Sequence, residues 1–511
     1  MKKALLLPMI SGTVLLTALA SVLFRPCRTN NSNQSAIPVV RQAPLPTFSD
    51  TAIWPIQQVP QRTLTFPPVG ALNLYGNMTT PAIVALFISG DGGWNAGVTN
   101  MAKAVAQDGQ TLVVGIDIAE YFKKLQAKTS ECLYPAADME ALSEFVQRTL
   151  QLPIYLKPVL VGHSSGASLA YALLCQAPLG TFRGGIALGF CPDIEISKPL
   201  CAGSGKLTMT RSKNGKYFDF TNQPSPGAPL ELLHGEMDQD CNCQKTCNFF
   251  QDVKLVNTVR LPKVGHGFAV VRNWLPQFKQ AMQQIYTMTD RNTGMLLPAF
   301  GGPNPVASTT NLPLAVTQAV TDMSKPMVLF ISGDGGWTGM DQQICDHLAA
   351  KNVPTVGLNS QSYFWNKKTP EQTVADLEPV IRNYLSAWGK TKFILAGYSF
   401  GANIAPFIVN RLSIDLKGKL DHLVLLSSDP KGDFEIHVAG MLGSGGGPYD
   451  VATELRNMRD APVLCVSGEK EDDLMQKALR GVQGVQFEKL PGSHSYNGDA
   501  EKIAKVILKD L

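Results

Sequence analysis

Two stretches decide the fold: VLVGHSSGASLAYALL at residues 159–174 and FILAGYSFGANIAPFI at residues 393–408. Each begins with an apolar run of strand length, turns at a G-x-S-x-G pentapeptide and continues with small and apolar residues at helical spacing. A serine between two glycines at such a strand-to-helix turn sits in strained backbone geometry that exposes its hydroxyl group. The dipole of the following helix favours negative charge that develops there. The pattern predicts two nucleophilic serines, Ser164 and Ser399.

Both stretches belong to a longer repeat. The eight residues FISGDGGW occur at 87–94 and return unchanged at 330–337. The number of residues that separates equivalent positions of the two copies is slightly smaller at the serines than at the tryptophans, so the second copy has shorter loops. Because there are only two copies, each about 200 residues long, the repeat is a duplicated domain and not a solenoid.

Composition places the boundaries of the two copies. A chain of 511 residues is too long for one ordinary core. We expect a first domain at residues 71–289 and a second at 308–511, joined by a linker at 290–307 that contains glycine and proline. Residues 25–70 are rich in Pro, Gln, Asn and Ser, which predicts an extended tether.

Strands and helices alternate within each copy. Continuous apolar runs at 83–89 and 327–332 predict strands buried on both faces of a sheet. Helical periodicity follows at 138–150 and 374–388. This rhythm predicts an α/β protein with two tandem domains, each a mostly parallel sheet flanked by helices.

A serine at such a turn requires an acid and a histidine, which follow it in that order along the chain. In the second copy, a strand at 463–467 leads into an acidic loop, and His494 follows the next strand. In the first copy, a strand at 230–233 and His266 stand in the same places. The chain has only seven histidines, so their presence at both places is informative. We predict His494 and His266 as general bases.

The acid of each site lies in the loop between that strand and the histidine. We predict Asp473 in the second copy and Asp240 in the first, because these two residues align with each other. Asp472 and Asp238 are the alternatives, since sequence does not fix the register of the loop.

The repeated Gly-rich loop completes each site. Such sites take one oxyanion donor from the loop after the first strand and another from the residue after the nucleophile. The predicted oxyanion and binding residues are Gly90, Asp91, Gly92 and Ser165 in the first copy and Gly333, Asp334, Gly335 and Phe400 in the second. Two readings of Asp91 and Asp334 stand: they bind a cation of the substrate, or they pin the turn by hydrogen bonds. A phosphate-binding loop is not favoured, because the chain lacks the G-x-x-x-x-G-K-[ST] and G-x-G-x-x-G patterns.

Net charge and cysteine content bear on whether the chain binds nucleic acid or a metal. A formal net charge of only +4 gives no electrostatic case for nucleic acid. Seven of the ten cysteines lie in the first copy, which predicts one or more disulfides there and an oxidising compartment. Cys241, Cys243 and Cys247 could instead hold a metal, but no histidine stands at the matching spacing, so disulfides are favoured. Serine chemistry of the predicted kind uses no metal and no organic cofactor.

The first residues have the pattern expected of an export signal. Lys2 and Lys3 precede a charge-free apolar run at residues 4–24, which contains small residues where a signal peptidase cuts. The run is also long enough to span a bilayer once. We expect residues 1–24 to remain as a membrane anchor, with cleavage after Ala20 as the alternative.

Three motifs of the second copy point to a family: SGDGGW at 332–337, GYSFG at 397–401 and DFEIH at 433–437. Together they resemble the VirJ/AcvB family of bacterial virulence proteins, and the resemblance covers most of the second copy. The first copy is less similar, since His163 and Ser165 replace the tyrosine and the phenylalanine on either side of the serine.

The resemblance implies an α/β-hydrolase fold and a periplasmic or membrane-associated enzyme. Such an enzyme would cleave the aminoacyl ester of lysyl- or alanyl-phosphatidylglycerol, so its partners would be membrane phospholipid and the inner-membrane surface. The serine would attack the ester carbonyl while the histidine takes its proton. Two alternatives stand, because a fold does not fix a substrate: another exported esterase or peptidase, or a non-enzymatic secretion accessory. A serine, an acid and a histidine in both copies argue against the accessory.

Overall fold

The computed structural model describes residues 58–290, 294, 312–320, 322–437, 447–458 and 461–509. The expected signal or anchor at 1–24 and nearly all of the predicted linker at 290–307 lie outside these ranges. Within them, no helix combines the length and the apolarity needed to cross a membrane.

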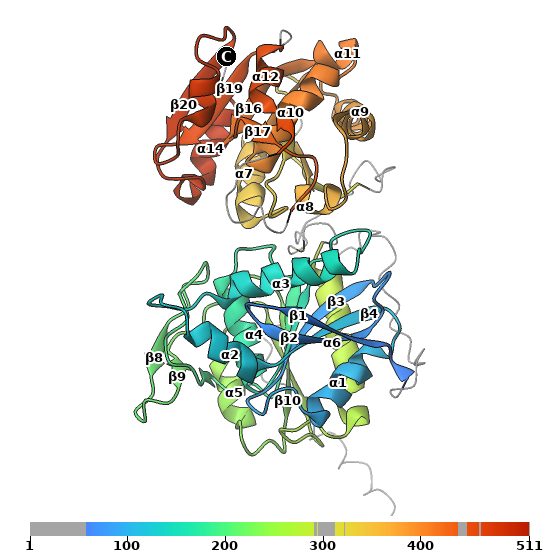
Figure 1. Cartoon of the computed structure of the whole chain (residues 1–511), viewed down its shortest axis with the longest axis vertical. Coiled ribbons are helices and arrows are strands. Elements are labelled where there is room, and N and C mark those ends of the chain that lie inside the picture. Colours follow the sequence, from blue (N-terminus) through green and yellow to red (C-terminus); the bar gives the residue numbers. More distant parts are fainter. Residues whose placement is uncertain are drawn as a thin grey trace, which may run out of the picture.

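Two large sheets organise the chain (Figure 1). The eight-stranded first sheet has the order β1-β2-β4-β3-β5-β6-β10-β11, and the seven-stranded second sheet has the order β12-β14-β13-β15-β16-β19-β20. In both sheets every strand is parallel to its neighbours except at one edge, where β1 and β2, or β12, run antiparallel. The strands are β1 Gln61–Phe66, β2 Gly70–Gly76, β3 Ile83–Ile88, β4 Thr111–Ile116, β5 Val159–His163, β6 Gly184–Leu188, β10 Leu230–Gly235, β11 Val256–Leu261, β12 Leu314–Thr317, β13 Met327–Ile331, β14 Thr355–Leu358, β15 Phe393–Tyr398, β16 Leu420–Leu426, β19 Val463–Gly468 and β20 Val485–Leu490. The predicted α/β class with two mostly parallel sheets is confirmed.

Helices cover both faces of each sheet, and this explains the continuous apolar runs. Alternate residues of β3 point into two cores: Val84, Leu86 and Ile88 pack with α2, α3 and α4, whereas Ala85 and Phe87 pack with α1 and α6. In the second domain α9, α10 and α12 cover one face, and α7 and α14 cover the other. The helices are α1 Ala96–Ala106, α2 Ile118–Gln126, α3 Pro135–Thr149, α4 Ser165–Gln176, α5 Cys243–Phe249, α6 Leu275–Met288, α7 Gly339–Ala349, α8 Ser360–Tyr363, α9 Pro370–Ala387, α10 Phe400–Arg411, α11 Ile414–Lys417, α12 Val451–Arg456, α13 Leu474–Ala478 and α14 Ala500–Ile507.

The first sheet begins earlier than the sequence predicted. Strand β1 lies inside the stretch 25–70 that was predicted as a tether, and it pairs antiparallel with β2. Its residues are mostly exposed, as expected at an open sheet edge. An edge strand buries little apolar surface, so its composition resembles that of a linker, and the prediction is wrong for this segment.

The first domain carries an insertion between β6 and β10 that the second domain lacks. It contains a small sheet of β7 Asp193–Ile194, β9 Phe218–Phe220 and β8 Met209–Arg211. Disulfides Cys132–Cys201 and Cys191–Cys241 tie it to the rest of the domain, which confirms the expected disulfides. The second domain has instead β17 Lys431–Gly432 paired with β18 Tyr449–Asp450.

Candidate active sites

The two predicted nucleophiles sit at equivalent turns. Ser399 immediately precedes α10 with φ 53° and ψ −113°, and Ser164 precedes α4 with φ 56° and ψ −124°. A positive φ is strained for a residue with a side chain, and such strain is typical of functional positions. Both hydroxyl groups therefore stand at the carboxyl end of a central parallel strand and at the N-terminus of a helix.

The flanking glycines are required by close packing. A Cβ at Gly397 would lie 2.4 Å from the carbonyl oxygen of Gly401, and one at Gly401 would lie 2.2 Å from that of Ile331. Gly162 and Gly166 are equally crowded in the first copy. The G-x-S-x-G pattern thus lets the helix start directly against the strands.

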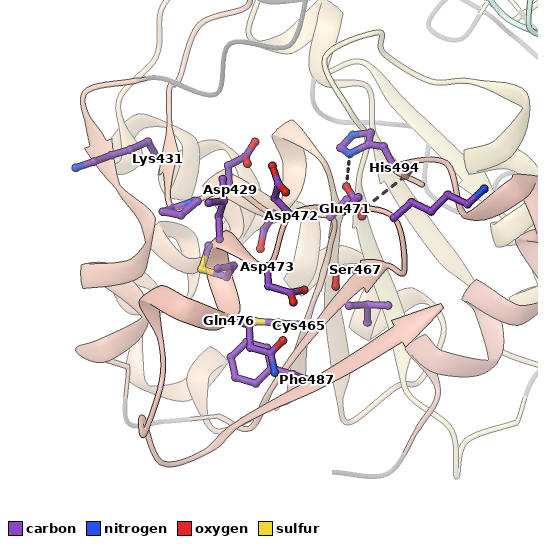
Figure 2. A pocket seen from close by; sticks show the side chains of 17 residues that line it. Asp429, Lys431, Cys465, Ser467, Glu471, Asp472, Asp473, Gln476, Phe487 and His494 are labelled. Atoms are coloured by element: carbon purple, nitrogen blue, oxygen red, sulfur yellow. Dashed lines mark hydrogen bonds and ion pairs between the residues drawn. The ribbon is translucent and has the colours of Figure 1, made fainter. Parts of the chain in front are cut away.

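The second site joins three side chains in a hydrogen-bonded chain. His494 Nε2 lies 2.9 Å from Ser399 Oγ, and His494 Nδ1 lies 2.7 Å from Glu471 Oε1 (Figure 2 shows His494 and Glu471). The other oxygen of Glu471 accepts hydrogen bonds from the amide of Gly468 at 2.6 Å and the hydroxyl of Ser427 at 2.8 Å. The serine, the base and the acid are thus held in the order that nucleophilic catalysis needs.

The acid of the second site was predicted wrongly. Asp473 forms an ion pair with Lys489 at 2.6 Å, and both Asp472 and Asp473 line a cavity beside the site. The turn after β19 folds back so that the amide of Glu471 donates to the carbonyl of Gly468. This turn aims Glu471 at the histidine, while Asp473 begins α13 further along.

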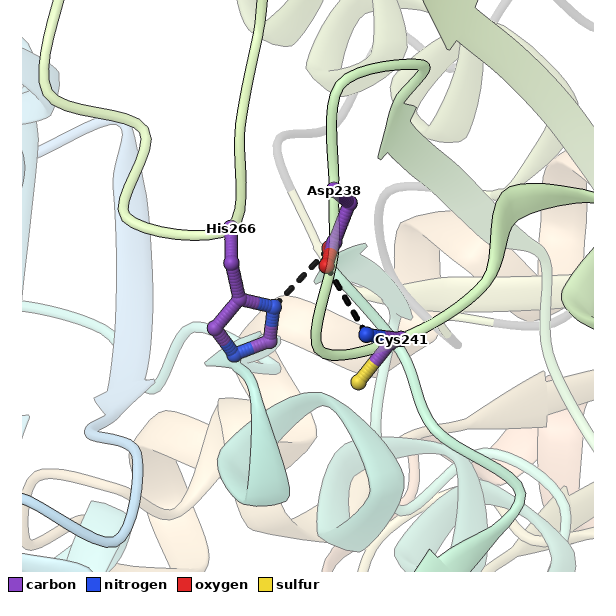
Figure 3. Close-up of side chains that lie close together, drawn as sticks. All are labelled: Asp238, Cys241 and His266. Carbon is purple, nitrogen blue, oxygen red and sulfur yellow. Dashed lines mark hydrogen bonds and ion pairs between the residues drawn. The ribbon is translucent and has the colours of Figure 1, made fainter.

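The first site has the same geometry with a shorter acid. His266 Nε2 lies 2.8 Å from Ser164 Oγ. His266 Nδ1 lies 2.8 Å from Asp238 Oδ2 (Figure 3 shows His266 and Asp238). The other oxygen of Asp238 accepts from the amides of Asp240 and Cys241 at 3.0 and 2.8 Å. The prediction of Asp240 is therefore wrong, and the alternative, Asp238, is the partner of the histidine. The alignment of the two loops had the right register but placed the acid two residues too late.

The cysteines beside the first site do not form a metal centre. Asp238, Cys241 and His266 bring donor atoms within 4.8 Å of one another (Figure 3). However, the sulfur of Cys241 is bonded to Cys191, and both ring nitrogens of His266 are already engaged. Cys247 is disulfide-bonded as well, so this cluster does not fit the metal alternative.

Electrostatics prepare both histidines as bases. The hydrogen bond to Glu471 raises the pKa of His494 above its usual value, and the nearby charges of Asp429 and Asp334 add to this effect. The hydrogen bond to Asp238 raises the pKa of His266 in the same way. Burial by itself raises the pKa of Glu471, but its hydrogen bonds, first that from His494, lower the pKa by more, so the net shift is downward. The acid therefore stays ionised and stabilises an imidazolium.

The repeated loop lies against the nucleophile in both copies. A Cβ on Gly333 would lie 3.6 Å from Cβ of Ser399, and one on Gly90 would lie 3.0 Å from Cβ of Ser164. The loop that contains Gly335 in one copy and Gly92 in the other therefore reaches the helix N-terminus at Phe400 or Ser165. The loop and the helix N-terminus thus lie beside the same serine, and an oxyanion hole formed by their N–H groups stays a prediction.

The aspartates of this loop hold its shape. Asp91 Oδ2 accepts a hydrogen bond of 2.6 Å from Ser165 Oγ, which ties the loop to α4. Asp334 Oδ1 accepts from the next amide, that of Gly335, at 3.2 Å. Where the first copy has Ser165, Phe400 packs on Phe364 with ring centroids 5.1 Å apart. The geometry favours the turn-pinning reading in both copies.

The residue before each serine has a role that the sequence did not reveal. Tyr398 donates from its hydroxyl to the carbonyl of His494 at 3.1 Å. His163 Nε2 lies 2.8 Å from the carbonyl oxygen of His266 and so makes the equivalent contact. A histidine can replace a tyrosine here because both reach the main chain of the catalytic base. The sequence holds a signal for this role, because tyrosine and histidine at the same position of the repeat can both donate a hydrogen bond.

Different hollows adjoin the two sites. A cavity of about 590 Å³ opens beside His494 and is lined by acidic residues and two lysines (Figure 2). The acidic residues are Asp429, Glu471, Asp472 and Asp473. A hollow of about 450 Å³ next to Asp91 is lined instead by Lys123, Arg211 and Lys216, with Glu195. Asp429, which sequence reasoning missed, follows β16, and burial raises its pKa.

The sheet order and the serine–histidine–acid sets at the carboxyl edges define two α/β-hydrolase domains. The chain belongs to the VirJ family of bacterial virulence proteins, whose family model matches residues 82–178 and 325–511, more than half of the chain. The matched segments contain both serine turns, so both copies carry the family signal.

Several solved structures are similar to part of the chain. MenH from S. aureus is 11% identical over 39% of this chain and 97% of its own, with a TM-score of 0.32. A lipase-esterase related protein from Clostridium acetobutylicum is 15% identical over 40% of this chain and 100% of its own, with a TM-score of 0.32. An α/β serine hydrolase without a lid from Xanthomonas campestris is 19% identical over 46% and 96%, with a TM-score of 0.28. No curated protein sequence matches the chain.

Proposed function

We propose that the chain is an exported serine hydrolase whose second domain cleaves the aminoacyl ester of aminoacyl-phosphatidylglycerol. The observation that carries this proposal is the Ser399–His494–Glu471 set beside an acidic cavity. The VirJ family membership supports a hydrolase-like protein.

The geometry supports covalent catalysis in two steps. His494 takes the proton of Ser399 as the serine oxygen attacks the ester carbonyl, and the imidazolium is stabilised by Glu471. The amide of Phe400 and the loop of Gly333 stabilise the oxyanion. The glycerol oxygen leaves with the proton from His494, and phosphatidylglycerol departs. Water then attacks the aminoacyl-enzyme by the same proton path, which releases the amino acid and restores the serine.

The acidic cavity supports an aminoacyl ester over a neutral one. The substrate carries an ammonium group two bonds from the attacked carbonyl, and a desolvated ammonium without a partner costs several kcal/mol. Asp429 lines the cavity together with His494, so its carboxylate is the candidate partner. Two acidic residues of the DFEIH motif, Asp433 and Glu435, are further candidates by sequence, but both have other partners: Asp433 pairs with His437 at 2.9 Å, and Glu435 lies 3.7 Å from Arg148 of the first domain.

The proposal includes a place outside the cytoplasm. Lys2, Lys3 and the apolar run at 4–24 support export and retention at the inner membrane, where the lipid would be within reach. Disulfides in the first domain fit an oxidising compartment.

The test uses the purified full chain and its Ser164→Ala, Ser399→Ala and double variants. Lysyl- and alanyl-phosphatidylglycerol in vesicles are compared with a neutral acetyl ester. We expect Ser399→Ala to reduce release of the amino acid by on the order of a thousandfold or more, because the nucleophile is lost. Full activity of Ser399→Ala would overturn the assignment to the second domain. Hydrolysis of the acetyl ester alone indicates a different esterase, and lipid binding without hydrolysis indicates a secretion accessory.

A further inference from the structure

The second active site lies at the interface between the domains. Contacts to the first domain come from segments that follow three strands of the second: Gly335 and Gly339 after β13, Gln361, Trp365 and Asn366 after β14, and Glu435 and Ile436 after β16. All of them follow the carboxyl ends of parallel strands, which is the edge of the sheet that carries Ser399. In Figure 1, α8 accordingly faces the first domain.

The first domain meets this edge with its opposite side. Its contact residues lie on α3, on the segment that leads into β5 and, at Leu179, on the segment that leads into β6, all at the amino ends of its strands. Figure 1 shows α3 along the side that faces the second domain. The serine of the first domain, at the carboxyl end of β5, therefore points away from the interface. The domains are arranged head to tail, and among the described residues the second site alone has the other domain as a neighbour.

The interface is built from buried, specific contacts. Trp365 is only 1% exposed, and its indole nitrogen donates to the carbonyl of Leu152 at 3.0 Å. The guanidinium of Arg148 lies 3.9 Å from the centre of the Trp365 ring and donates to the carbonyls of Trp365 and Ile436. The indole N–H of this buried tryptophan finds its hydrogen-bond acceptor in the other domain, and this contact fixes the relative orientation of the two domains.

A buried lysine reaches from the first domain to the oxyanion loop of the second. Lys157 is 6% exposed, and its Nζ donates to the carbonyl of Gly335 at 3.4 Å. Burial lowers the pKa of Lys157, while the carboxylates of Glu140, Glu144 and Asp341 oppose that change. The lysine is therefore held in a cluster of carboxylates that both domains supply.

Glu144 links the same cluster to α8. Its Oε1 accepts a hydrogen bond of 2.6 Å from Gln361 Nε2 across the interface. Burial raises the pKa of Glu144 to about 8, and the charge of Glu140 adds to this effect. Gly336, which follows the carbonyl held by Lys157, in turn packs against Gln361: a Cβ there would lie 2.9 Å from that side chain. The loop that contains Gly333 is thus fixed from the side of the first domain.

We propose that the first domain is a working part of the second active site, in which Lys157 positions the oxyanion loop from Gly333 to Gly335. Lys157 is a positioning residue, because it acts on the carbonyl of Gly335 and not on the substrate. The peptide plane whose carbonyl Lys157 holds also carries the N–H of Gly336, which donates to the carbonyl of Gly333 at 3.1 Å and closes the turn. Holding that carbonyl therefore fixes the turn that places Gly333 beside Ser399, where the start of the loop would meet the developing oxyanion. The inference rests on the proposed function, since it requires Ser399 to be a nucleophile.

The repeat itself supplies the matched control. Lys392 occupies the position in the second copy that Lys157 has in the first, just before the strand that leads to the serine. Its side chain is 61% exposed and forms an ion pair with Asp421 at 2.9 Å on the surface. The same residue type at the same place thus has a role at an interface in one copy and a surface role in the other.

The test compares Lys157→Met and Lys392→Met in the full chain with Ser164→Ala, so that only the second site can act. We expect Lys157→Met to lower kcat by about tenfold or more at a nearly unchanged KM, since misplaced oxyanion donors act on the transition state. Lys392→Met should leave both constants unchanged. In the reciprocal background, Ser399→Ala, labelling of Ser164 by a fluorophosphonate should be the same with and without Lys157→Met, which shows that the first domain stays folded.

Two results would overturn the inference. One is an unchanged kcat for Lys157→Met, and the other is an equal loss at both serines, which would mark a general loss of stability. If the Ser164→Ala chain hydrolyses no ester at all, the proposed function itself fails, and this outcome is visible before any lysine is changed.

Discussion

Glu471 and Asp238 occupy the same position in the two copies, three residues after the glycine that ends the preceding strand. The longer glutamate reaches its histidine and also accepts from a side-chain hydroxyl, that of Ser427. The shorter aspartate relies on backbone amides of its own loop. The exposed fractions of the histidine side chains also differ, at 50% for His494 and 19% for His266, so the second site is the more open one.

The raised pKa of His494 predicts the pH profile of the second site. Only neutral His494 can accept the serine proton, so kcat/KM should rise with pH through a pKa above the usual 6.5. Glu471→Gln removes the charge that favours the protonated ring, so the acid limb should move to lower pH. The same change should lower kcat, on the order of 10²- to 10⁴-fold.

Asp473→Asn is the control for this profile, because Asp473 pairs with Lys489 and not with the base. Both variants are measured in the full chain with Ser164→Ala. An acid limb that stays in place in Glu471→Gln would show that Glu471 is not what raises the pKa of His494.

Substrate charge is predicted to be recognised by Asp429 and not by Asp334. Asp429→Asn should reduce hydrolysis of lysyl- or alanyl-phosphatidylglycerol about ten- to a hundredfold more than hydrolysis of a neutral acetyl ester, the worth of one charge-assisted hydrogen bond. Asp334→Asn should reduce both substrates by one factor, because Asp334 shapes the loop through the Gly335 amide. The opposite pattern would show that Asp334 binds the ammonium, which is the other of the two readings that the sequence left open.

At the scale of elements, the two domains differ most in the segment between the strand after the serine helix and the acid-bearing strand. In the first domain this segment folds into β7, β8 and β9, and the Cys191–Cys241 bond joins it to the acid loop. Cys241 also donates its amide to Asp238, so the disulfide and the acid share one short turn. The second domain holds its acid without a disulfide among the described residues.

Removing that bond is predicted to affect the first site selectively. Cys191→Ala with Cys241→Ala frees a loop of 50 residues, and the entropy argument assigns such a loop up to about 4 kcal/mol. We expect a lower Tm and slower fluorophosphonate labelling of Ser164, with labelling of Ser399 unchanged.

The Cys132–Cys201 pair is the matched control, because it closes a loop of 69 residues without a contact to the acid loop. Its removal should lower Tm, but at a temperature well below Tm it should leave the rate of Ser164 labelling unchanged. Equal effects of both pairs on labelling would show that the disulfides contribute only general stability.

At the scale of the whole molecule, the two similar domains differ in what lies next to their active sites. The head-to-tail contact places Arg148 and Lys157 of the first domain against loops at the edge that carries the second site, whereas the first site lies at the far edge of its own sheet. A duplicated enzyme domain has thereby become, in our proposal, part of the catalytic environment of its partner.

Export is predicted at this scale as well. Alkaline phosphatase fused after residue 57, ahead of the first described strand, should be active because it folds only outside the cytoplasm. A fusion that lacks residues 1–24 should be inactive, since the signal is gone. A stably produced but inactive full-length fusion would contradict export.

The sequence by itself determined the features that depend on local pattern. The turn that strains Ser164 and Ser399 needs glycines at fixed positions, and buried parallel strands need continuous apolar runs, so both could be read from the order of residues. His266 and His494 were found because histidine is rare in this chain and the fold fixes its order after the serine.

Only the tertiary structure decided which acid meets each histidine and what surrounds the sites. The loop after β19 offers Glu471, Asp472 and Asp473 within three positions, and the twist of one turn selects among them. The edge strand β1 escaped notice because it is stabilised by pairing with β2 and not by its own burial. The contact of Lys157 with Gly335 joins residues far apart in the chain, and no local pattern encodes which edge of one domain will face the other.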